Sequence, residues 1–339
     1  MPDQLNHGIK IAAQLSPEPS TEDITFIRQL GVDYVVLNVD GEKASQEYYL
    51  SRRKLFEEAG ITVYGINNKA VHNSDAIILN LPNRDEKLEE YKNHLANLGR
   101  ASIPYTTWGP AANGIWSTEP ERSRGGAISR AFDLQKARQG QWNGKTFKMP
   151  LSHGRKYSEE EIWENYKYYI KEIASVAEES GVLIGIHPVD PPVSELAGIP
   201  RCIFGSFDGY EKAFEIADSP NIGMCLCVGC WLEGGESMGR DVIETIRYFG
   251  KLGKIFKVHF RNVNAPLPHF VETLLDNGYM NMRKVAEALE EVDFKGVVIA
   301  DHVPLLTGDS KDNQRVSTAF SLGYMKALFR RAGDAGSGE

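Results

Sequence analysis

Short segments rich in Val and Ile alternate along this chain with longer segments whose apolar residues recur at helical spacing, and eight such pairs can be counted. The predicted strands cover residues 8–14, 33–38, 61–66, 103–108, 182–187, 222–227, 255–260 and 297–301. The predicted helices cover residues 21–30, 45–59, 84–98, 159–180, 207–217, 240–250, 281–291 and 315–330. Parallel strands require connections of this length. The pattern therefore predicts an α/β fold, a (β/α)8 TIM barrel that spans residues 1–339 as a single domain.

The connection after the fourth predicted strand is much longer than the others. Residues 109–157 show no clear periodicity and are expected to be irregular. Because long connections inside a domain usually carry function, we expect an insertion or lid segment here, with a solvated excursion as the alternative. Residues 332–339 are small and polar, and we expect them to form a flexible tail.

Charge and composition exclude several classes of partner. The chain has 38 Lys and Arg residues against 46 Asp and Glu residues, a net charge of −8, which argues against nucleic acid or an anionic membrane surface as a partner. No apolar run is long enough to span a membrane, and the N-terminus lacks the pattern of a secretory signal. These features predict a cytoplasmic protein that acts on a small molecule. They are also compatible with a homo-oligomer.

Four neighbouring predicted strands end in residues that can bind a transition metal. These residues are His187, Cys227, His259 and Asp301. Strand ends converge at the mouth of a parallel barrel, so the sequence predicts that the four side chains meet there. Two imidazoles, a thiolate and a carboxylate suit Mn, Fe, Co or Zn better than Mg or Ca. Taken singly, each residue also has an ordinary interpretation as a hydrogen-bonded His, a buried Cys or a helix-capping Asp.

A second cysteine pattern competes with this metal site. Cys225-x-Cys227-x-x-Cys230 could begin a thiolate cluster, for which Cys202 is the one remaining cysteine. Strand alternation instead places Cys225 one layer below Cys227 inside the barrel, where a cysteine packs as a small apolar residue.

The strings around the four strand ends resemble the mannonate dehydratase family in order and spacing. They are IHPVDPP from Ile186, LCVG from Leu226, HFRNV from His259, and the pair Asp301-His302. The resemblance implies a lyase that dehydrates a sugar acid, D-mannonate, to 2-keto-3-deoxy-gluconate. It also implies one divalent metal, Mn²⁺ or Fe²⁺, held by the same four residues. The family motif Arg-Pro-Asp-His-Gly is replaced here by residues 299–303, Ile-Ala-Asp-His-Val, so the chain is similar to a divergent member.

Further residues near the strand ends and in the long connection are candidates for acid–base chemistry and substrate binding. For catalysis we expect His302, with Tyr324 as a second candidate. The expected substrate-binding residues are Arg261, Asn262, Glu272, Asn113, Trp116 and Arg124. For each, a structural role in packing or in a surface ion pair is the alternative.

Two other functions fit the same predicted site. A metal-dependent sugar isomerase or epimerase would use the same barrel to move a proton between carbons, and the departures from the family motif favour it. A barrel that binds a sugar and metal without turnover is the third interpretation, and the intact set of four ligands argues against it.

Overall fold

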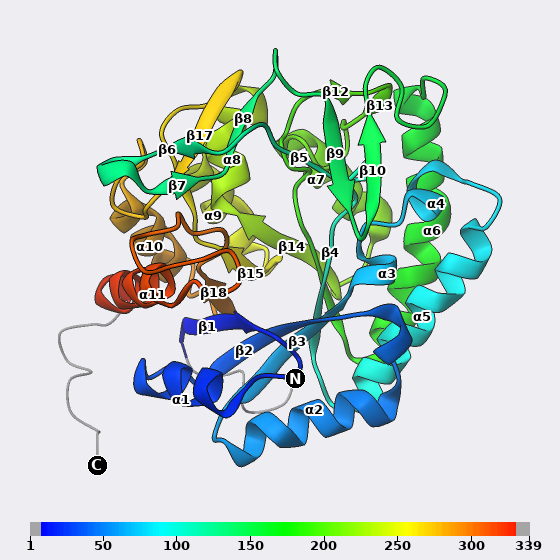
Figure 1. The fold of residues 1–339 in the computed structure, drawn as a ribbon. Coiled ribbons are helices and arrows are strands. Elements are labelled where there is room, and N and C mark those ends of the chain that lie inside the picture. The colour runs from blue at the N-terminus through cyan, green and yellow to red at the C-terminus, as the bar shows by residue number, and fades with distance from the viewer. Residues whose placement is uncertain (1–7, 330–339) are drawn as a thin grey trace.

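Eight parallel strands form a nearly closed barrel, surrounded by helices, in the computed structural model, which describes residues 8–329 (Figure 1). The strands are β1 (Lys10–Leu15), β2 (Tyr34–Val39), β3 (Thr62–Asn68), β4 (Tyr105–Trp108), β11 (Leu183–Ile186), β14 (Ile222–Cys227), β15 (Ile255–His259) and β18 (Val297–Ile299). They pair in parallel in the order β3-β2-β1-β18-β15-β14-β11-β4. The predicted (β/α)8 barrel is confirmed. The predicted tail, residues 332–339, lies outside the described residues.

Strands β3 and β4 lie at the two ends of this order and meet at the seam of the barrel. Asn67 Oδ1 accepts a hydrogen bond of 2.8 Å from the backbone N–H of Thr107 across the seam. Gly65 allows the close approach, because a Cβ atom there would lie 2.6 Å from the Tyr105 ring. The seam thus fixes Asn67 and Thr107 beside each other at the mouth.

The predicted helices all form on the outside of the barrel. They are α1 (Thr21–Gln29), α2 (Gln46–Glu58), α5 (Arg84–Arg100), α6 (Glu159–Ser180), α7 (Phe207–Ala217), α9 (Val242–Lys251), α10 (Met282–Glu291) and α11 (Arg315–Phe329). Capping boxes begin α1 at Ser20 and α6 at Ser158, because each serine and the acid three residues later satisfy exposed N–H groups. The structure adds three short helices that the periodicity does not reveal: α3 (Lys69–His72), α4 (Asp75–Leu79) and α8 (Val228–Gly234).

The inside of the barrel is layered. A small apolar cluster inside it includes residues from six strands, and for four of these strands the residue two positions further along the chain lines a cavity at the mouth. Because side chains two apart point to the same face of a strand, an apolar layer supports a polar one. The four pairs are Ala12 and Gln14, Val36 and Asn38, Tyr105 and Thr107, and Ile299 and Asp301.

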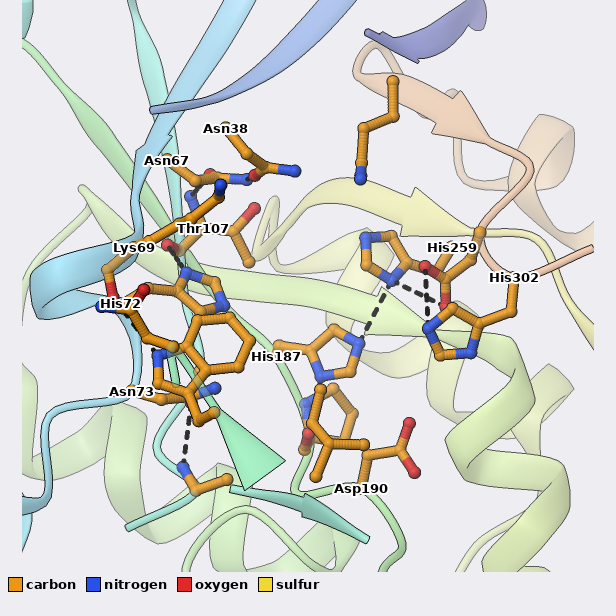
Figure 2. A pocket seen from close by; sticks show the side chains of 18 of the residues that line it. Asn38, Asn67, Lys69, His72, Asn73, Thr107, His187, Asp190, His259 and His302 are labelled. Atoms are coloured by element: carbon orange, nitrogen blue, oxygen red, sulfur yellow. Dashed lines mark hydrogen bonds and ion pairs between the residues drawn. The ribbon is translucent and has the colours of Figure 1, made fainter. Parts of the chain in front are cut away.

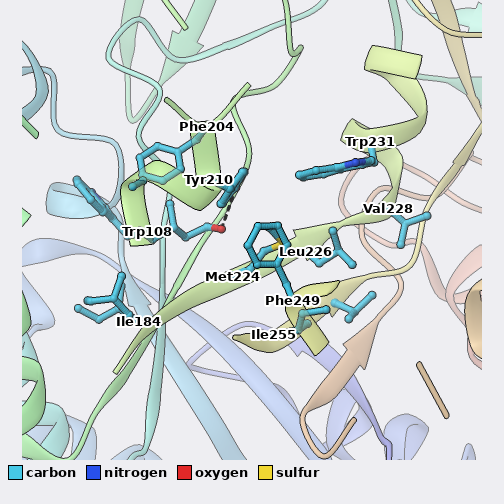
Figure 3. Close-up of a cluster of buried hydrophobic side chains, with 14 of the residues drawn as sticks. Trp108, Ile184, Phe204, Tyr210, Met224, Leu226, Val228, Trp231, Phe249 and Ile255 are labelled. Carbon is cyan, nitrogen blue, oxygen red and sulfur yellow. Dashed lines mark hydrogen bonds between the residues drawn. The ribbon is translucent and has the colours of Figure 1, made fainter. Parts of the chain in front are cut away.

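A second apolar cluster packs strands β4, β11 and β14 against the helices outside them (Figure 3). Trp108 meets Tyr169 edge to face with ring centroids 5.0 Å apart. The Tyr210 hydroxyl donates to the Ile186 carbonyl at 3.1 Å, immediately before His187. This packing holds the ends of β11 and β14 rigidly.

Residues 109–157 contain six short strands that the sequence pattern does not reveal, joined by the irregular stretches that were predicted. The strands are β5 (Ile115–Trp116), β6 (Glu121–Arg122), β7 (Ile128–Ser129), β8 (Ala131–Asp133), β9 (Gln139–Trp142) and β10 (Lys145–Lys148). Strands β5, β9 and β10 make one small sheet, and β8 pairs with β17 (His269–Thr273), which pairs with β16 (Asn262–Val263). A further hairpin joins β12 (Glu195–Leu196) to β13 (Ile199–Pro200). Pairing with distant strands orders a segment that lacks periodicity of its own.

None of the helices within residues 8–329 has both the length and the apolar character needed to cross a membrane.

Candidate metal and active site

Four side chains from neighbouring strands lie together at the barrel mouth. His187 follows β11, Cys227 ends β14, His259 ends β15 and Asp301 lies two residues beyond β18. One ligand atom from each, imidazole nitrogen, sulfur or carboxylate oxygen, lies within 4.8 Å of the others. Two ligands bound about 2.0–2.3 Å from one ion are at most about 4.6 Å apart. The spacing and chemistry of this ligand cluster, His187, Cys227, His259 and Asp301, therefore fit one transition-metal ion.

The two imidazoles of the ligand cluster face the same point (Figure 2). His187 Nδ1 lies 2.6 Å from the Pro188 carbonyl oxygen. With the proton on Nδ1, this bond leaves the Nε2 lone pair directed at the cluster. His187 Nε2 lies 3.1 Å from His259 Nδ1, which lies 3.4 Å from Asp301 Oδ2.

Asp301 and Cys227 supply negative charge to the ligand cluster. Burial alone would raise the pKa of Asp301, but the charges of His259, His302 and Arg261 and a hydrogen bond to His259 together hold this pKa well below its usual value. Burial would also raise the pKa of the Cys227 thiol, but a hydrogen bond from Cys230 and the charge of Arg261 bring it well below its usual value. A thiolate and a carboxylate together suit a divalent cation.

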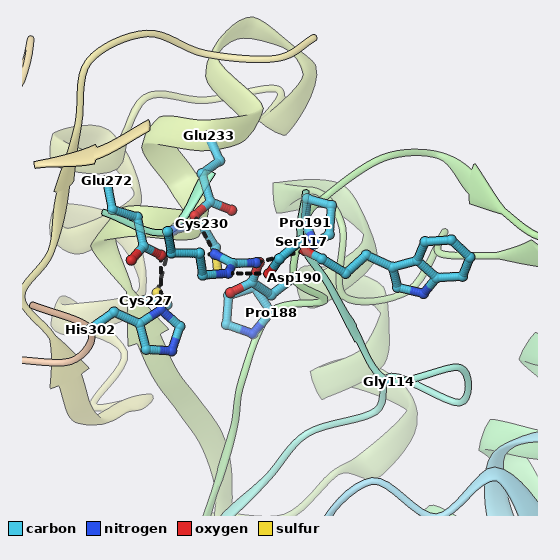
Figure 4. A network of polar contacts seen from close by, with 12 residues as sticks. Gly114, Ser117, Pro188, Asp190, Pro191, Cys227, Cys230, Glu233, Glu272 and His302 are labelled. Atoms are coloured by element: carbon cyan, nitrogen blue, oxygen red, sulfur yellow. Dashed lines mark hydrogen bonds and ion pairs between the residues drawn. The ribbon is translucent and has the colours of Figure 1, made fainter. Parts of the chain in front are cut away.

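Arg261 lies behind the ligand cluster and is completely buried. Its Nη2 donates to Glu233 Oε1 at 2.8 Å and to Asp190 Oδ2 at 3.3 Å, and it lies 3.4 Å and 3.3 Å from the sulfurs of Cys227 and Cys230. Figure 4 shows these acids and sulfurs gathered around one point. Asp190, Cys230 and Glu233 could themselves hold a metal, but here they surround a guanidinium. The predicted contact of Arg261 with substrate is wrong, because the side chain has no exposed surface.

Arg130 joins the insertion to the same network. Its Nη2 donates to Asp190 Oδ1 at 2.6 Å, and its Nη1 donates to Glu272 Oε1 at 2.8 Å. Burial would raise the pKa of Asp190, but Arg130 and Arg261 outweigh it and lower this pKa to about 2. Glu272 is 2% exposed. The predicted contact of Glu272 with substrate is therefore wrong, because its carboxylate is enclosed by the two arginines.

His302, the predicted acid–base residue, lines the cavity beside the ligand cluster. Its Nδ1 lies 2.8 Å from Glu272 Oε1, and its side chain is 38% exposed. Burial lowers the pKa of His302, but Asp301 and Glu272 outweigh burial and raise it. Arg261 Nη1 also lies 2.6 Å from His302 Nδ1, so Nε2, 4.0 Å from Asp301 Oδ1, is the ring nitrogen left to exchange a proton with a bound molecule.

The cavity at the mouth has a volume of about 320 Å³. Its wall opposite the ligand cluster carries Gln14, Asn38, Asn67 and Thr107, with the buried ammonium of Lys257 3.4 Å from Thr107 Oγ1. Amides, hydroxyls and an ammonium bind hydroxyl groups and a carboxylate. This polar wall was not predicted, although the predicted strands 8–14 and 33–38 end at two of its residues, Gln14 and Asn38.

His72, at the end of α3, is a second imidazole of the cavity that the site prediction missed. Its Nδ1 lies 2.7 Å from the Thr107 carbonyl oxygen, so with the proton on Nδ1 the lone pair of Nε2 is free. The ring stacks on Trp142 of the insertion with centroids 5.1 Å apart. Burial lowers the pKa of His72 to about 3, so the ring is neutral. Figure 2 shows His72 and His187 in the same cavity.

Three other predicted substrate contacts are buried structural residues. Asn113 donates to the Leu196 carbonyl at 2.7 Å and accepts from Arg201 at 2.8 Å. Trp116 is 0% exposed and donates to the Asn113 carbonyl. Asn262 donates to the Leu275 and Met280 carbonyls. These predictions are wrong, because the polar groups bind the backbone of neighbouring loops.

Arg124 and Tyr324 lie outside the cavity at the mouth. Arg124 makes a surface ion pair with Asp276 at 2.8 Å, and its contact with an anionic substrate stays a prediction. Tyr324 lies on α11 and stacks on Phe320 with centroids 6.5 Å apart. Its side chain is partly buried in the outer helical layer, and its catalytic role stays a prediction.

Comparison with solved structures first defines the class of protein by its fold, a (β/α)8 barrel. A xylose isomerase domain protein from Planctomyces limnophilus superposes with a TM-score of 0.62 at 14% identity, covering 95% of this chain and 97% of the other. A D-psicose 3-epimerase from Clostridium cellulolyticum H10 gives 0.61 at 14% identity, covering 95% of this chain and all of the other. Identities this low show the fold alone.

The chain belongs to the mannonate dehydratase family. A family model described as D-mannonate dehydratase (UxuA) matches residues 133–333. A mannonate dehydratase of Streptococcus equi subsp. zooepidemicus is 31% identical over 93% of this chain and 92% of its own length. The crystal structure of mannonate dehydratase from Streptococcus suis serotype 2 superposes with a TM-score of 0.82 at 27% identity over 95% of this chain and 94% of that one. The family is metal-dependent, and these matches do not favour the isomerase or epimerase alternative.

Proposed function

We propose that this chain is a hydro-lyase that removes water from D-mannonate to form 2-keto-3-deoxy-gluconate. One observation carries the proposal: the family match spans residues 133–333 and so includes all four residues of the ligand cluster and His302. The amides and the ammonium of the polar wall suit a polyhydroxy acid, since they bind hydroxyls and a carboxylate.

His187, Cys227, His259 and Asp301 would hold one divalent metal, and Mn²⁺ or Fe²⁺ suits their mixed nitrogen, sulfur and oxygen donors. Such an ion, when bound, stabilises negative charge that develops on substrate oxygens.

The two free imidazoles divide the proton transfers. Dehydration removes the proton from the carbon next to the carboxylate and expels the hydroxyl of the following carbon as water. His72 lines the cavity and its Nδ1 is turned to the Thr107 carbonyl, so we assign its Nε2 the acceptance of the proton from carbon. The pKa of His302 is raised, so its Nε2–H gives a proton to the departing hydroxyl. Lys257 pairs with the substrate carboxylate, and Asn38 and Asn67 hold the remaining hydroxyls.

A substrate panel tests the activity. The protein loaded with Mn²⁺ is incubated with D-mannonate and with its C2 epimer D-gluconate, and the 2-keto-3-deoxy acid is measured. We expect product from D-mannonate. Interconversion of aldoses and ketoses, with no keto-deoxy acid from any aldonate, would contradict the proposal and support an isomerase.

Two substitutions test the proton transfers. His302→Ala and His72→Asn should each keep the bound metal and lower kcat by roughly 10²–10⁴-fold, the usual contribution of a general acid or base. Asn can still donate to the Thr107 carbonyl from the position of His72, so the local fold is kept. A variant with the kcat of the unaltered protein would remove that residue from the mechanism.

The remaining parts of the proposal concern compartment and assembly. Four free cysteines favour a reducing compartment, and we propose the cytoplasm. A homo-oligomer stays a prediction that sedimentation of the purified protein would test.

A further inference from the structure

Cys230 is a buried thiol beside the ligand cluster that the proposed reaction does not use. It follows Cys227 by three residues, and α8 begins between them, with Cys227 as its N-cap. The backbone N–H of Cys230 donates to Cys227 Sγ at 3.3 Å. Both cysteines are reduced in the structure and completely buried.

The two sulfurs are held together on one side of a single guanidinium. Arg261 Nη2 lies 3.4 Å from Cys227 Sγ and 3.3 Å from Cys230 Sγ, and the Cys230 thiol also hydrogen-bonds to Cys227. A Cys-x-x-Cys pair at the start of a helix is the arrangement in which redox-active disulfides form, because the first turn brings the two side chains together. Forming the bond here needs rotation of side chains that already touch.

We infer that Cys227 and Cys230 form a reversible disulfide when the enzyme meets a peroxide, and that this disulfide removes the thiolate ligand and releases the metal. The inference rests on the proposed function, in which Cys227 is a metal ligand. Cys225 is not placed to form such a disulfide with Cys227. It precedes Cys227 by two residues on the same strand, and the extended backbone of β14 keeps the two side chains apart.

The chemistry balances with hydrogen peroxide as the oxidant. The Cys227 thiolate attacks one peroxide oxygen, an S–O bond forms, and the O–O bond breaks to leave hydroxide. The Cys230 thiol then attacks the sulfenic sulfur, the S–S bond forms, and the S–O bond breaks to release water. Two thiols lose two electrons, and the peroxide is reduced. The cavity of about 320 Å³ that His187, His259 and Asp301 line brings a peroxide, close to water in size, to the three other ligands. Cys227 itself does not line the cavity, so the peroxide has to pass between these side chains to reach its sulfur.

The experiment compares the full-length protein, loaded with Mn²⁺, with its Cys230→Ser variant after the same hydrogen peroxide treatment. Serine keeps a donor at this position and removes the second sulfur. The readouts are the number of free thiols in the unfolded protein, peptide mapping of any disulfide, and bound Mn²⁺ after desalting. None of them needs D-mannonate turnover, so a failure of the proposed activity is seen separately.

We expect the free thiols to fall from four to two in the unaltered protein, with a Cys227–Cys230 linkage, loss of most bound Mn²⁺, and recovery of both after dithiothreitol and Mn²⁺ are added. Cys230→Ser should form no disulfide at Cys227. Its Mn²⁺ should therefore not show the release by peroxide and the recovery after dithiothreitol that we expect of the unaltered protein. Retention of four thiols and the metal in the unaltered protein, or a disulfide between other cysteines, would overturn the inference. The inference would also be overturned if Cys230→Ser lost as much Mn²⁺ as the unaltered protein and regained it after dithiothreitol and Mn²⁺ were added.

Discussion

Replacing Arg261 by methionine measures how much the buried ionic network stabilises the barrel. Methionine keeps part of the apolar volume and removes the charge and all the hydrogen bonds. The guanidinium lies 2.7 Å from Glu272 Oε1 and 2.8 Å from Glu233 Oε1, and it has no exposed surface. Removing one partner of a buried ion pair costs about 3–5 kcal/mol, because the other charge is left unpaired. Arg130 still neutralises Glu272 at 2.8 Å, so we expect the lower end, about 3 kcal/mol.

Urea unfolding of the metal-free proteins checks this value. With a slope near 3 kcal/mol/M, a loss of about 3 kcal/mol lowers the unfolding midpoint by about 1 M. Arg124→Met is the matched control, since it removes an ion pair of 2.8 Å to Asp276 in which the two side chains are 43% and 32% exposed. Such surface pairs contribute about 0–1 kcal/mol. Equal midpoints for the two variants would refute the reasoning that burial makes the Arg261 network strong.

The remaining predictions concern the ligand cluster and the charges around it. Cys227→Ala should lose most of the bound metal in elemental analysis, and unchanged metal content would exclude this ligand. Burial and Asp190 raise the pKa of Glu233 well above its usual value, which means that they disfavour its charged form. Glu233→Gln should therefore cost less than about 1 kcal/mol in urea unfolding, because the amide oxygen can still accept a hydrogen bond from Arg261. Burial would raise the pKa of Asp75, but its bonds to His153 and Lys145 lower it to about 2, below the ordinary 3.8. Its contribution to stability is therefore complete above about pH 4 and is lost as the pH falls toward 2. The melting temperature of Asp75→Asn should be lower than that of the unaltered protein at pH 6, and the two should approach each other near pH 3; a constant difference would contradict this.

The barrel and its ligand cluster could both be predicted because they depend on local rules. Period-two and period-3.6 patterns mark the strands and helices, and strands that run parallel in a closed barrel all end at the same mouth. Knowing where β11, β14, β15 and β18 end is therefore enough to bring four distant residues together. The same rule extended to the predicted strands 8–14 and 33–38 would have found Gln14 and Asn38.

The substrate contacts could not be predicted in this way. Arg261 and Trp116 look like residues that grip a ligand, but both are 0% exposed in the folded chain. Their burial depends on residues far away in sequence, since Glu233 and Glu272 enclose Arg261, and β9 covers the region of Trp116. His72 becomes a cavity residue only because Trp142 of the insertion stacks on it.

The sequence by itself thus determined the order of the strands and helices, the (β/α)8 barrel and the identity of the ligand cluster, since these follow from periodicity and strand ends. The tertiary structure alone decided which polar side chains face the cavity and which are enclosed. That outcome depends on which distant segments pack over a residue and which distant groups form hydrogen bonds with it. A local sequence pattern contains no information on either of these.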